Sequence, residues 1–353
     1  MQEVIALAKQ AQGQTHPNPM VGCLVLQGQE IIARGYHRGP GKWHAERDAL
    51  LELSVEQTRG ASLFVNLEPC CHFGRTPPCT NIIIEKEIEI VYVGMLDPDP
   101  RVAGKGIQIL REAGIEVVVG IEEEACRRLN AAYLTARQKG RPYFTLKTAC
   151  SMDGYICSAY GESKWITNTQ SRAKGHQLRA AHDGILVGIG TVLADDPSLN
   201  TRLQGTNEQN AIPIVLDSRL RTPRAAKLRT AGKKPLLFYA EKEACSQEES
   251  AEYIPVSRDN KGLNLADIAK VLVDRGIYSV LLEGGAGIHR SFFEKGWVDR
   301  IEIFQAPIIL GDGKKWLSTS AFHLNLAPNF ELVEVSAYKS DVHLCYEQRQ
   351  KHV

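Results

Sequence analysis

The sequence lacks any apolar run close to the roughly 20 residues that a membrane-spanning helix needs. Its first residues, Met1 to Val4 (MQEV), lack the cationic and apolar regions of a secretory signal. The nine cysteines are scattered and odd in number, which makes a poor disulfide framework. These absences predict a protein of the reducing cytoplasm that neither spans nor binds a membrane.

The sequence also lacks an excess of charge of either sign. Lys and Arg number 42 and Asp and Glu 41, which leaves a formal net charge of +1 over 353 residues. Domains that bind polyanions usually carry a clear basic surplus, and neither half of this chain does. A small-molecule ligand is therefore favoured over nucleic acid.

The length of 353 residues predicts two domains, at roughly 100–200 residues each. Gly140-Arg141-Pro142 interrupts the pattern, so we place the boundary between residues 1–140 and 141–353. In the first half, short apolar runs alternate with helical patterns, which indicates an α/β domain with a largely parallel sheet. Its predicted strands are 20–27, 31–35, 62–67, 88–96 and 115–119, and its predicted helices are 45–54, 79–86, 105–113 and 121–137.

The second half repeats the α/β pattern and ends in a strand-rich tail from residue 298. Residues 241–262 are polar and charged, and we expect a surface excursion there. The predicted strands are 143–149, 184–189, 212–216, 235–240 and 278–283, and the predicted helices are 169–181, 264–275 and 287–295.

The motifs of the first half predict a metal site. His44-Ala45-Glu46 opens a predicted helix, and Pro69-Cys70-Cys71 and Cys79 follow a later strand. One imidazole and two thiolates, His44, Cys70 and Cys79, can make three ligands of a tetrahedral zinc site whose fourth position is open to water. Helix N-termini would favour the thiolates. Glu46 is placed to move protons without ligating the metal.

The H-x-E…P-C pattern is typical of zinc-dependent base deaminases, although their C-x-x-C ending is missing here. Two alternatives stay open. The cysteines could be small core residues unrelated to a metal, or Cys71 or His72 could close a purely structural zinc site. Neighbouring side chains on a helix diverge by about 100°. After Pro69, at an expected helix start, we therefore predict that Cys70 rather than Cys71 binds the metal.

HAE and EPCCHFGRTPPC together resemble the deaminase half of the bifunctional riboflavin-biosynthesis deaminase/reductases. The family separates its second and third ligands as Cys70 and Cys79 are separated. Asp97-Pro98-Asp99-Pro100 resembles the family's DPNP, but a carboxylate at position 99 can only accept where an amide could also donate. Prolines beside Asn18 and Asp97 also suit simple turns. The resemblance implies substrate contacts at Asn18, His37, His72, Arg75 and Asp97.

The second half carries glycine clusters that let backbone N–H groups approach a phosphate. Gly188-x-Gly190 and Gly285-x-Gly287 lack the third glycine of a dinucleotide fingerprint. The segment instead resembles the family's reductase domain, which has a dihydrofolate reductase-like fold and uses NADPH. The resemblance implies cofactor contacts at Ala149, Trp165, Thr191, Asp195, Ser218, Gly285, Ala286, Gly287, Ile288, His289, Arg290 and Ser291. It implies substrate contacts at Ser163, Arg179, Leu199, Arg202 and Glu283.

Arg179 and Arg202 suit a ribityl phosphate. From the residues alone, the simpler interpretation is that both arginines form surface ion pairs and that Trp165 lies in the core. Lys147 and Asp153 shape the expected site without an assigned role.

The resemblance covers almost the whole chain, so its implications are concrete. It implies a cytidine-deaminase-like three-layer domain followed by the dihydrofolate reductase-like domain. The first would deaminate 2,5-diamino-6-ribosylamino-4(3H)-pyrimidinone 5′-phosphate with one zinc ion per chain, and the second would reduce the product's ribosyl group to ribityl. A homo-oligomer is expected. The alternatives are a nucleobase or tRNA-editing deaminase with an appended domain, and a zinc-stabilised binding module without catalysis.

Overall fold

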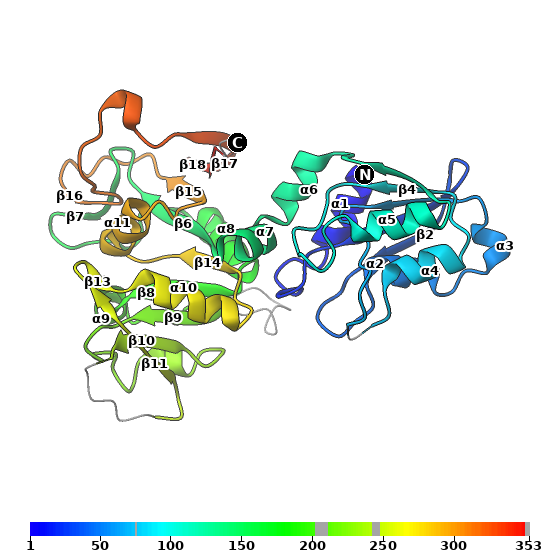
Figure 1. Cartoon of the computed structure of the whole chain (residues 1–353). Coiled ribbons are helices and arrows are strands. Elements are labelled where there is room, and N and C mark those ends of the chain that lie inside the picture. Colours follow the sequence, from blue (N-terminus) through cyan, green and yellow to red (C-terminus); the bar gives the residue numbers. More distant parts are fainter. Residues whose placement is uncertain (75, 202–210, 242–247, 350–353) are drawn as a thin grey trace. The chain divides into compact units, whose positions relative to one another are not determined.

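The computed structural model describes residues 1–74, 76–201, 211–241 and 248–349 (Figure 1). The chain divides into two compact units, Met1–Arg141 and Pro142–Val353, and each is described by itself. None of the helices in the described ranges combines the length and the apolar character needed to cross a membrane.

The first unit is built on a five-stranded sheet with the order β2-β1-β3-β4-β5. The predicted parallel arrangement holds for β3, β4 and β5, whereas β1 is antiparallel to both β2 and β3. The two residues between β1 and β2 include Gly28 at φ 60°, and so short a connection can join only antiparallel strands. The strands are β1 Gly22–Gln27, β2 Glu30–Tyr36, β3 Ser62–Val65, β4 Ile90–Val93 and β5 Glu116–Val119.

Helices cover both faces of this sheet. A Cβ on Gly22 would lie 2.2 Å from the Val4 oxygen of α1 (Gln2–Lys9), so that helix packs directly on the strand. A Cβ on Gly35 would lie 2.3 Å from the Ala45 oxygen of α2 (Ala45–Leu50). Gly35 pairs with Cys23, and successive residues of a strand face opposite sides, so the two helices cover opposite faces. The expected three-layer domain is confirmed.

Further helices of the first unit extend these two layers, with α4 beside α2, α5 beside α4, and α6 beside α1 (Figure 1). Helix α1 was not predicted, and the single helix expected over 121–137 is divided at Asn130. The Asn130 side chain accepts from Met20 N at 2.8 Å and donates to Met20 O at 3.0 Å, which ties that point of the chain to the loop before β1. The bounds are α3 Val55–Thr58, α4 Cys79–Glu85, α5 Lys105–Glu112, α6 Glu123–Leu129 and α7 Ala131–Lys139.

The second unit is built on a nine-stranded sheet with the order β11-β10-β9-β8-β14-β6-β15-β18-β17. It is parallel from β11 to β15 and ends in the antiparallel strands β18 and β17. Its strands are β6 Tyr143–Cys150, β8 Gly184–Gly188, β9 Ile212–Leu216, β10 Leu236–Ala240, β11 Glu252–Val256, β14 Ser279–Leu282, β15 Arg300–Gln305, β17 Phe330–Tyr338 and β18 Asp341–Gln348. Its helices are α8 Thr169–Ala180, α9 Ile189–Asp195, α10 Leu265–Asp274 and α11 Ala286–Glu294.

Two small pairs of strands complete this unit, β7 (Tyr155–Ser158) with β16 (Gly313–Lys315) and β12 (Arg258–Asp259) with β13 (Gly262–Leu263). The surface excursion expected over 241–262 is wrong in part, because β11 is the edge strand of the main sheet. Ile254 and Val256 are buried in its core, and the strand is only five residues long and follows a charged stretch, which hid it in a polar segment. Residues 242–247 of the predicted excursion lie outside the described residues.

Candidate functional site

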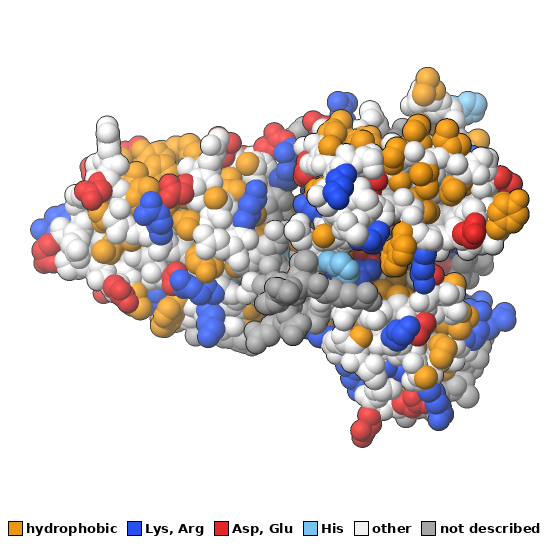
Figure 2. All heavy atoms as spheres, turned by 180° about the vertical axis from the view of Figure 1, so that it is seen from behind, with side chains coloured by type: hydrophobic (Ala, Val, Ile, Leu, Met, Phe, Trp, Pro, Cys, Tyr) orange, Lys and Arg blue, Asp and Glu red, His pale blue; other side chains and the backbone are white. Residues whose placement is uncertain are grey.

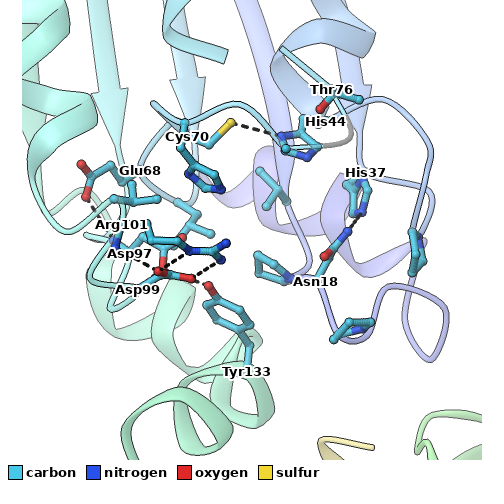
Figure 3. A pocket seen from close by; sticks show the side chains of 18 of the residues that line it. Asn18, His37, His44, Glu68, Cys70, Thr76, Asp97, Asp99, Arg101 and Tyr133 are labelled. Atoms are coloured by element: carbon cyan, nitrogen blue, oxygen red, sulfur yellow. Dashed lines mark hydrogen bonds and ion pairs between the residues drawn. The ribbon is translucent and has the colours of Figure 1, made fainter. Parts of the chain in front are cut away.

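Three elements of the first unit bring the predicted metal ligands together. Figure 3 shows two of these ligands, His44 and Cys70, side by side. His44 is the N-cap of α2, Cys79 is the first residue of α4, and Cys70 lies in the loop after β3. His44 Nδ1 is 3.4 Å from the Sγ atom of each cysteine, and the three ligand atoms lie within 4.8 Å of one another. The expectation that Cys70 begins a helix is wrong, because the helix begins nine residues later.

The donor set fits zinc. Zn–N bonds of about 2.0 Å and Zn–S bonds of about 2.3 Å at tetrahedral angles separate nitrogen from sulfur by about 3.5 Å. The observed 3.4 Å separations match this edge length. Cys71 Sγ points elsewhere and donates to Arg101 O at 3.6 Å. The sequence excluded Cys71 because neighbouring side chains on a helix diverge, and this reason is wrong because Cys70 and Cys71 are not in a helix. The contact with Arg101 O is what directs the Cys71 sulfur away from the ligand atoms.

The surroundings of the ligand cysteines and of Glu46 shift the pKa values of these side chains in ways that suit metal binding and acid–base catalysis. Hydrogen bonds from Cys79 and His44 lower the pKa of Cys70 to about 4, whereas the bond to Cys70 and burial raise the pKa of Cys79. One of the two thiols is therefore ionised at neutral pH, and the second gives up its proton when a metal binds. Glu46 follows His44 in the first turn of α2 and is 3% exposed. Burial and the nearby Cys70 thiolate raise the pKa of Glu46 to about 6, a value suited to general acid–base catalysis near neutral pH.

A cavity of about 450 Å³ opens onto these residues and is lined by four of the predicted substrate contacts, Asn18, His37, His72 and Asp97. Arg75 lies outside the described residues. His72 Nδ1 is buried and has no hydrogen-bond partner among the residues that the structure describes, so it is available to a ligand.

His37 and Asn18 form one unit in this cavity. His37 Nδ1 is 3.0 Å from Trp43 O, which can only accept, so Nδ1 carries the proton. His37 Nε2 then accepts from Asn18 Nδ2 at 3.0 Å, and burial lowers the pKa of His37, which keeps the ring neutral. Because the Asn18 amide nitrogen makes the bond to His37, the amide oxygen of Asn18 takes no part in it. The histidine thus fixes which way the asparagine amide points.

Sequence reasoning missed two residues that build the far wall of the cavity, Glu68 and Tyr133. The Glu68 carboxylate accepts from Gly104 N at 2.9 Å and Gly106 N at 3.0 Å at the start of α5. Tyr133 Oη donates to Asp97 Oδ1 at 3.0 Å. The glutamate of the EPC motif was visible in the sequence, but only the fold shows that it anchors a helix. Tyr133 carried no local signal.

In the second unit, the structure brings two predicted substrate residues into contact. Arg179 on α8 and Glu283 after β14 form an ion pair with a shortest separation of 2.5 Å, and their side chains are 19% and 8% exposed. Arg179 also donates to Asn200 O at 3.2 Å, beside Leu199, which is buried. This pair is enclosed, so the surface ion pair considered from the sequence is wrong. Arg202 lies outside the described residues, and Ser163 is exposed.

Lys147 lies next to this pair. Strands β14 and β6 are parallel with Leu282 opposite Leu146, so Glu283, the first residue after β14, comes beside Lys147 on β6. Burial would raise the pKa of Glu283, but Arg179 and Lys147 hold it at about 2. Burial lowers the pKa of Lys147, and Glu283 opposes that shift.

The predicted cofactor residues lie on several elements of the second unit. Thr191 and Asp195 are on α9, Ala149 is on β6, Ser218 follows β9, and Gly285 is the N-cap of α11. Trp165 is 72% exposed rather than in the core, with the Arg172 guanidinium 4.6 Å from its ring centroid.

The N-terminus of α11 also has a cation nearby that sequence reasoning missed. A Cβ on Gly285 would lie 3.5 Å from Lys314 Nζ and 4.0 Å from Thr191 Oγ1, so a cation and a hydroxyl flank this end of the helix. The arrangement suits a phosphate. His289, farther along α11, is 1% exposed, and its Nδ1 is 2.9 Å from Trp316 O.

Comparison with known proteins places the chain in a family. Residues 142–344 match the RibD C-terminal domain, and residues 1–95 match the cytidine and deoxycytidylate deaminase zinc-binding region. Over 318 residues the chain is 43% identical to the riboflavin biosynthesis protein RibD of Actinobacillus pleuropneumoniae, covering 88% of this chain and 84% of that protein. The chain belongs to the RibD family. RibD of Aquifex aeolicus is 44% identical over 313 residues, covering 89% of this chain and 87% of that protein.

Solved RibD structures share the whole fold. A diaminohydroxyphosphoribosylaminopyrimidine deaminase/5-amino-6-(5-phosphoribosylamino)uracil reductase of Thermotoga maritima has a TM-score of 0.89 and 34% identity, covering 99% of this chain and 97% of that one. RibD of Acinetobacter baumannii also has a TM-score of 0.89 and 34% identity, covering 99% and 98%. The predicted cytidine-deaminase-like and dihydrofolate reductase-like folds are confirmed.

Membership of the RibD family also confirms the resemblance found in the sequence. The chain is a bifunctional deaminase and reductase of riboflavin biosynthesis that acts on small molecules. Its cofactors are zinc, in the deaminase half, and NADPH, in the reductase half.

Proposed function

We propose that residues 1–140 form the deaminase and residues 141–353 the reductase. The first half would act on 2,5-diamino-6-ribosylamino-4(3H)-pyrimidinone 5′-phosphate and the second on 5-amino-6-(5-phosphoribosylamino)uracil. The observation that carries the proposal is the group His44, Cys70 and Cys79 with Glu46 beside it, at the wall of a cavity that can take a pyrimidine. The named activities of the Thermotoga maritima relative support the two substrates.

In the deaminase, His44, Cys70 and Cys79 would hold one zinc ion. Zinc, when bound, supplies a Lewis acid that makes water a nucleophile at neutral pH. Glu46 accepts a proton from the attacking water and returns it to the departing amine, so ammonia leaves and a carbonyl replaces the amine. Asn18, held by His37, presents its amide oxygen to an N–H of the pyrimidine. His72 and Asp97 complete the wall that orients the ring.

Ammonia release tests the deaminase assignment. The zinc-loaded protein is expected to release ammonia from the diaminopyrimidine nucleotide. A nucleobase or tRNA-editing deaminase would instead release it from a free base or from tRNA. A zinc-stabilised binding module would release none from any of these. The balanced charge of the chain favours the small substrate.

In the reductase, the N-terminus of α11, Thr191, Ser218 and Trp165 would hold NADPH, which supplies a hydride when bound. Reduction of a ribosyl to a ribityl group also consumes a proton. Lys147 is the group placed to supply it, because it is a cation with a lowered pKa beside the enclosed Arg179–Glu283 pair. Arg179 would then bind the phosphate of the sugar, while the ionised Glu283 accepts hydrogen bonds from its hydroxyl groups and holds the ammonium of Lys147 in place.

Lys147→Met is expected to reduce NADPH oxidation by about 10²-fold or more, because methionine keeps the side chain's length without a proton to donate. In the unchanged protein, the rate should fall as pH rises through a Lys147 pKa that lies below that of an ordinary lysine. The measurements are the pH profile of NADPH oxidation on the deaminated substrate and NADPH affinity by fluorescence. Lys270→Met, on the exposed side of α10, is the matched control. An unaltered rate in Lys147→Met would remove this residue from the reaction.

A homo-oligomer is part of the proposal and is supported by the sheet edge of the second unit. Strand β17 is nine residues long, lies at the end of the sheet and exposes Leu332 and Val335, 48% and 58% exposed. Figure 2 shows hydrophobic side chains gathered at the top of this unit. Unpaired strand edges with apolar side chains are suited to pairing with a second copy. The eight cysteines that the structure places form no disulfide with one another, which supports a reducing cytoplasm.

A further inference from the structure

Asp99 stands where the resemblance leads one to expect asparagine, and the structure shows what accompanies it. Its side chain lines the deaminase cavity, and the residue is 5% exposed. Arg101 binds it with two parallel contacts, Nε to Oδ1 at 2.9 Å and Nη2 to Oδ2 at 2.6 Å (Figure 3). Such fork-to-fork pairs are the strong and geometrically fixed kind of ion pair. Arg101 lies in the same cavity wall.

The other two carboxylates considered in this wall, Glu68 and Asp97, are stabilised by neutral hydrogen-bond donors and not, among the described residues, by a cation. Glu68 accepts four backbone N–H groups, from Asp97, Gly104, Gly106 and Ile107. Asp97 accepts Tyr133 Oη at 3.0 Å and Asp99 N at 2.9 Å. Asp99 alone among these three depends on a cation, and the hydrogen bonds and charge of Arg101 lower its pKa to about 2, so it is ionised.

We propose that Arg101 is a specificity-determining residue of the deaminase that neutralises Asp99 so that the cavity accepts an anionic substrate. The inference rests on the proposed function, in which the substrate carries a phosphate. A cavity with an unbalanced carboxylate would repel that phosphate, because like charges in a partly dry site interact strongly. Asparagine at position 99 would need no partner cation, whereas aspartate does.

The local backbone keeps its bonds when these side chains change, so charge can be tested apart from folding. Asp99 Oδ1 also accepts Arg101 N at 3.0 Å, a bond made by the backbone of residue 101 whatever its side chain. An asparagine at position 99 can accept the same N–H through its amide oxygen. The side chain of Arg101 is 61% exposed, and its removal leaves little buried space.

The test compares Arg101→Ala, Arg101→Lys and the double variant Asp99→Asn/Arg101→Ala, with kcat, KM and zinc content measured on the full chain. Arg101→Ala is expected to raise KM about tenfold or more at low salt, with kcat changed by less than about twofold. Added salt should shrink the increase, because salt screens charge and does not repair packing. The double variant should recover most of the loss, and Arg101→Lys should lose little. Arg59→Ala, which removes the exposed partner of Glu87, is the control.

Three results would overturn the inference. The first is an unchanged KM in Arg101→Ala, the second is a raised KM that does not respond to salt, and the third is no recovery in the double variant. Loss of zinc or of folding in Arg101→Ala that persists in the double variant would also overturn it, since it would show a structural role. A failure of the unchanged protein to release ammonia would instead contradict the proposed function itself.

Discussion

Glu46→Gln is expected to stop ammonia release while zinc and NADPH oxidation remain. Glutamine keeps the size of glutamate and can still hydrogen-bond, but it cannot accept and return a proton at neutral pH. Positioned acid–base groups contribute about 10²–10⁴-fold, and this one serves both the attacking water and the departing amine. We therefore expect a loss at or above the upper end of that range.

The other two activities of the Glu46→Gln variant make the test specific. Zinc should stay at one ion per chain, because Glu46 is not among the three ligating atoms that the structure groups together. Reduction of the deaminated substrate should continue, because Glu46 lies in the unit Met1–Arg141 and the proposed reductase residues lie in the other. Substantial ammonia release would remove Glu46 from the mechanism. Loss of zinc would make it a ligand, and loss of reduction would show that the halves depend on each other.

Cys70→Ser and Cys79→Ser are expected to lose both zinc and deamination, whereas Cys71→Ser keeps both. Serine is nearly isosteric with cysteine but is not ionised at neutral pH, so it cannot replace a thiolate ligand. The Cys70 and Cys79 sulfurs each lie 3.4 Å from His44 Nδ1, while the Cys71 sulfur contacts Arg101 O. Zinc content by atomic absorption and ammonia release measure the effect. Cys71→Ser is the matched control, because it makes the same chemical change one residue away.

The outcome for Cys71 decides between the two neighbouring cysteines. Zinc loss in Cys71→Ser alone, with zinc retained in Cys70→Ser, would reverse the ligand assignment. Zinc retained in all three variants would show that the metal is held elsewhere in the chain.

The metal ligands could be predicted because most of them lie in short sequence motifs. His44-x-Glu46 and Pro69-Cys70 keep ligand and base close in sequence, and only the position of Cys79 required a fold. The reason given against Cys71 failed, because the loop after β3 is not helical. Local pattern can name candidate ligands, but it cannot say where a loop turns each side chain.

What sequence reasoning missed depends on contacts between distant segments. The edge strand β11 is only five residues long, and its Ile254 and Val256 are recognisable as core residues only once they pack in the second unit. Helix α1 is the exception, because its buried Val4, Ile5 and Ala8 recur at helical spacing in the sequence itself. Glu68 and Tyr133 act on residues about 30 positions or more away, such as Asp97. Lys314 reaches the start of α11 from β16. No local propensity carries such information, because each residue is ordinary in its own segment.

The most direct test of a bifunctional chain is a single reaction with the diaminopyrimidine nucleotide and NADPH. The zinc-loaded protein is predicted to release one ammonia and then oxidise one NADPH per substrate, with no NADPH oxidation in the Glu46→Gln variant until the deaminated compound is added. NADPH oxidation that proceeds without ammonia release, or ammonia release with no NADPH oxidation at any stage, would contradict it.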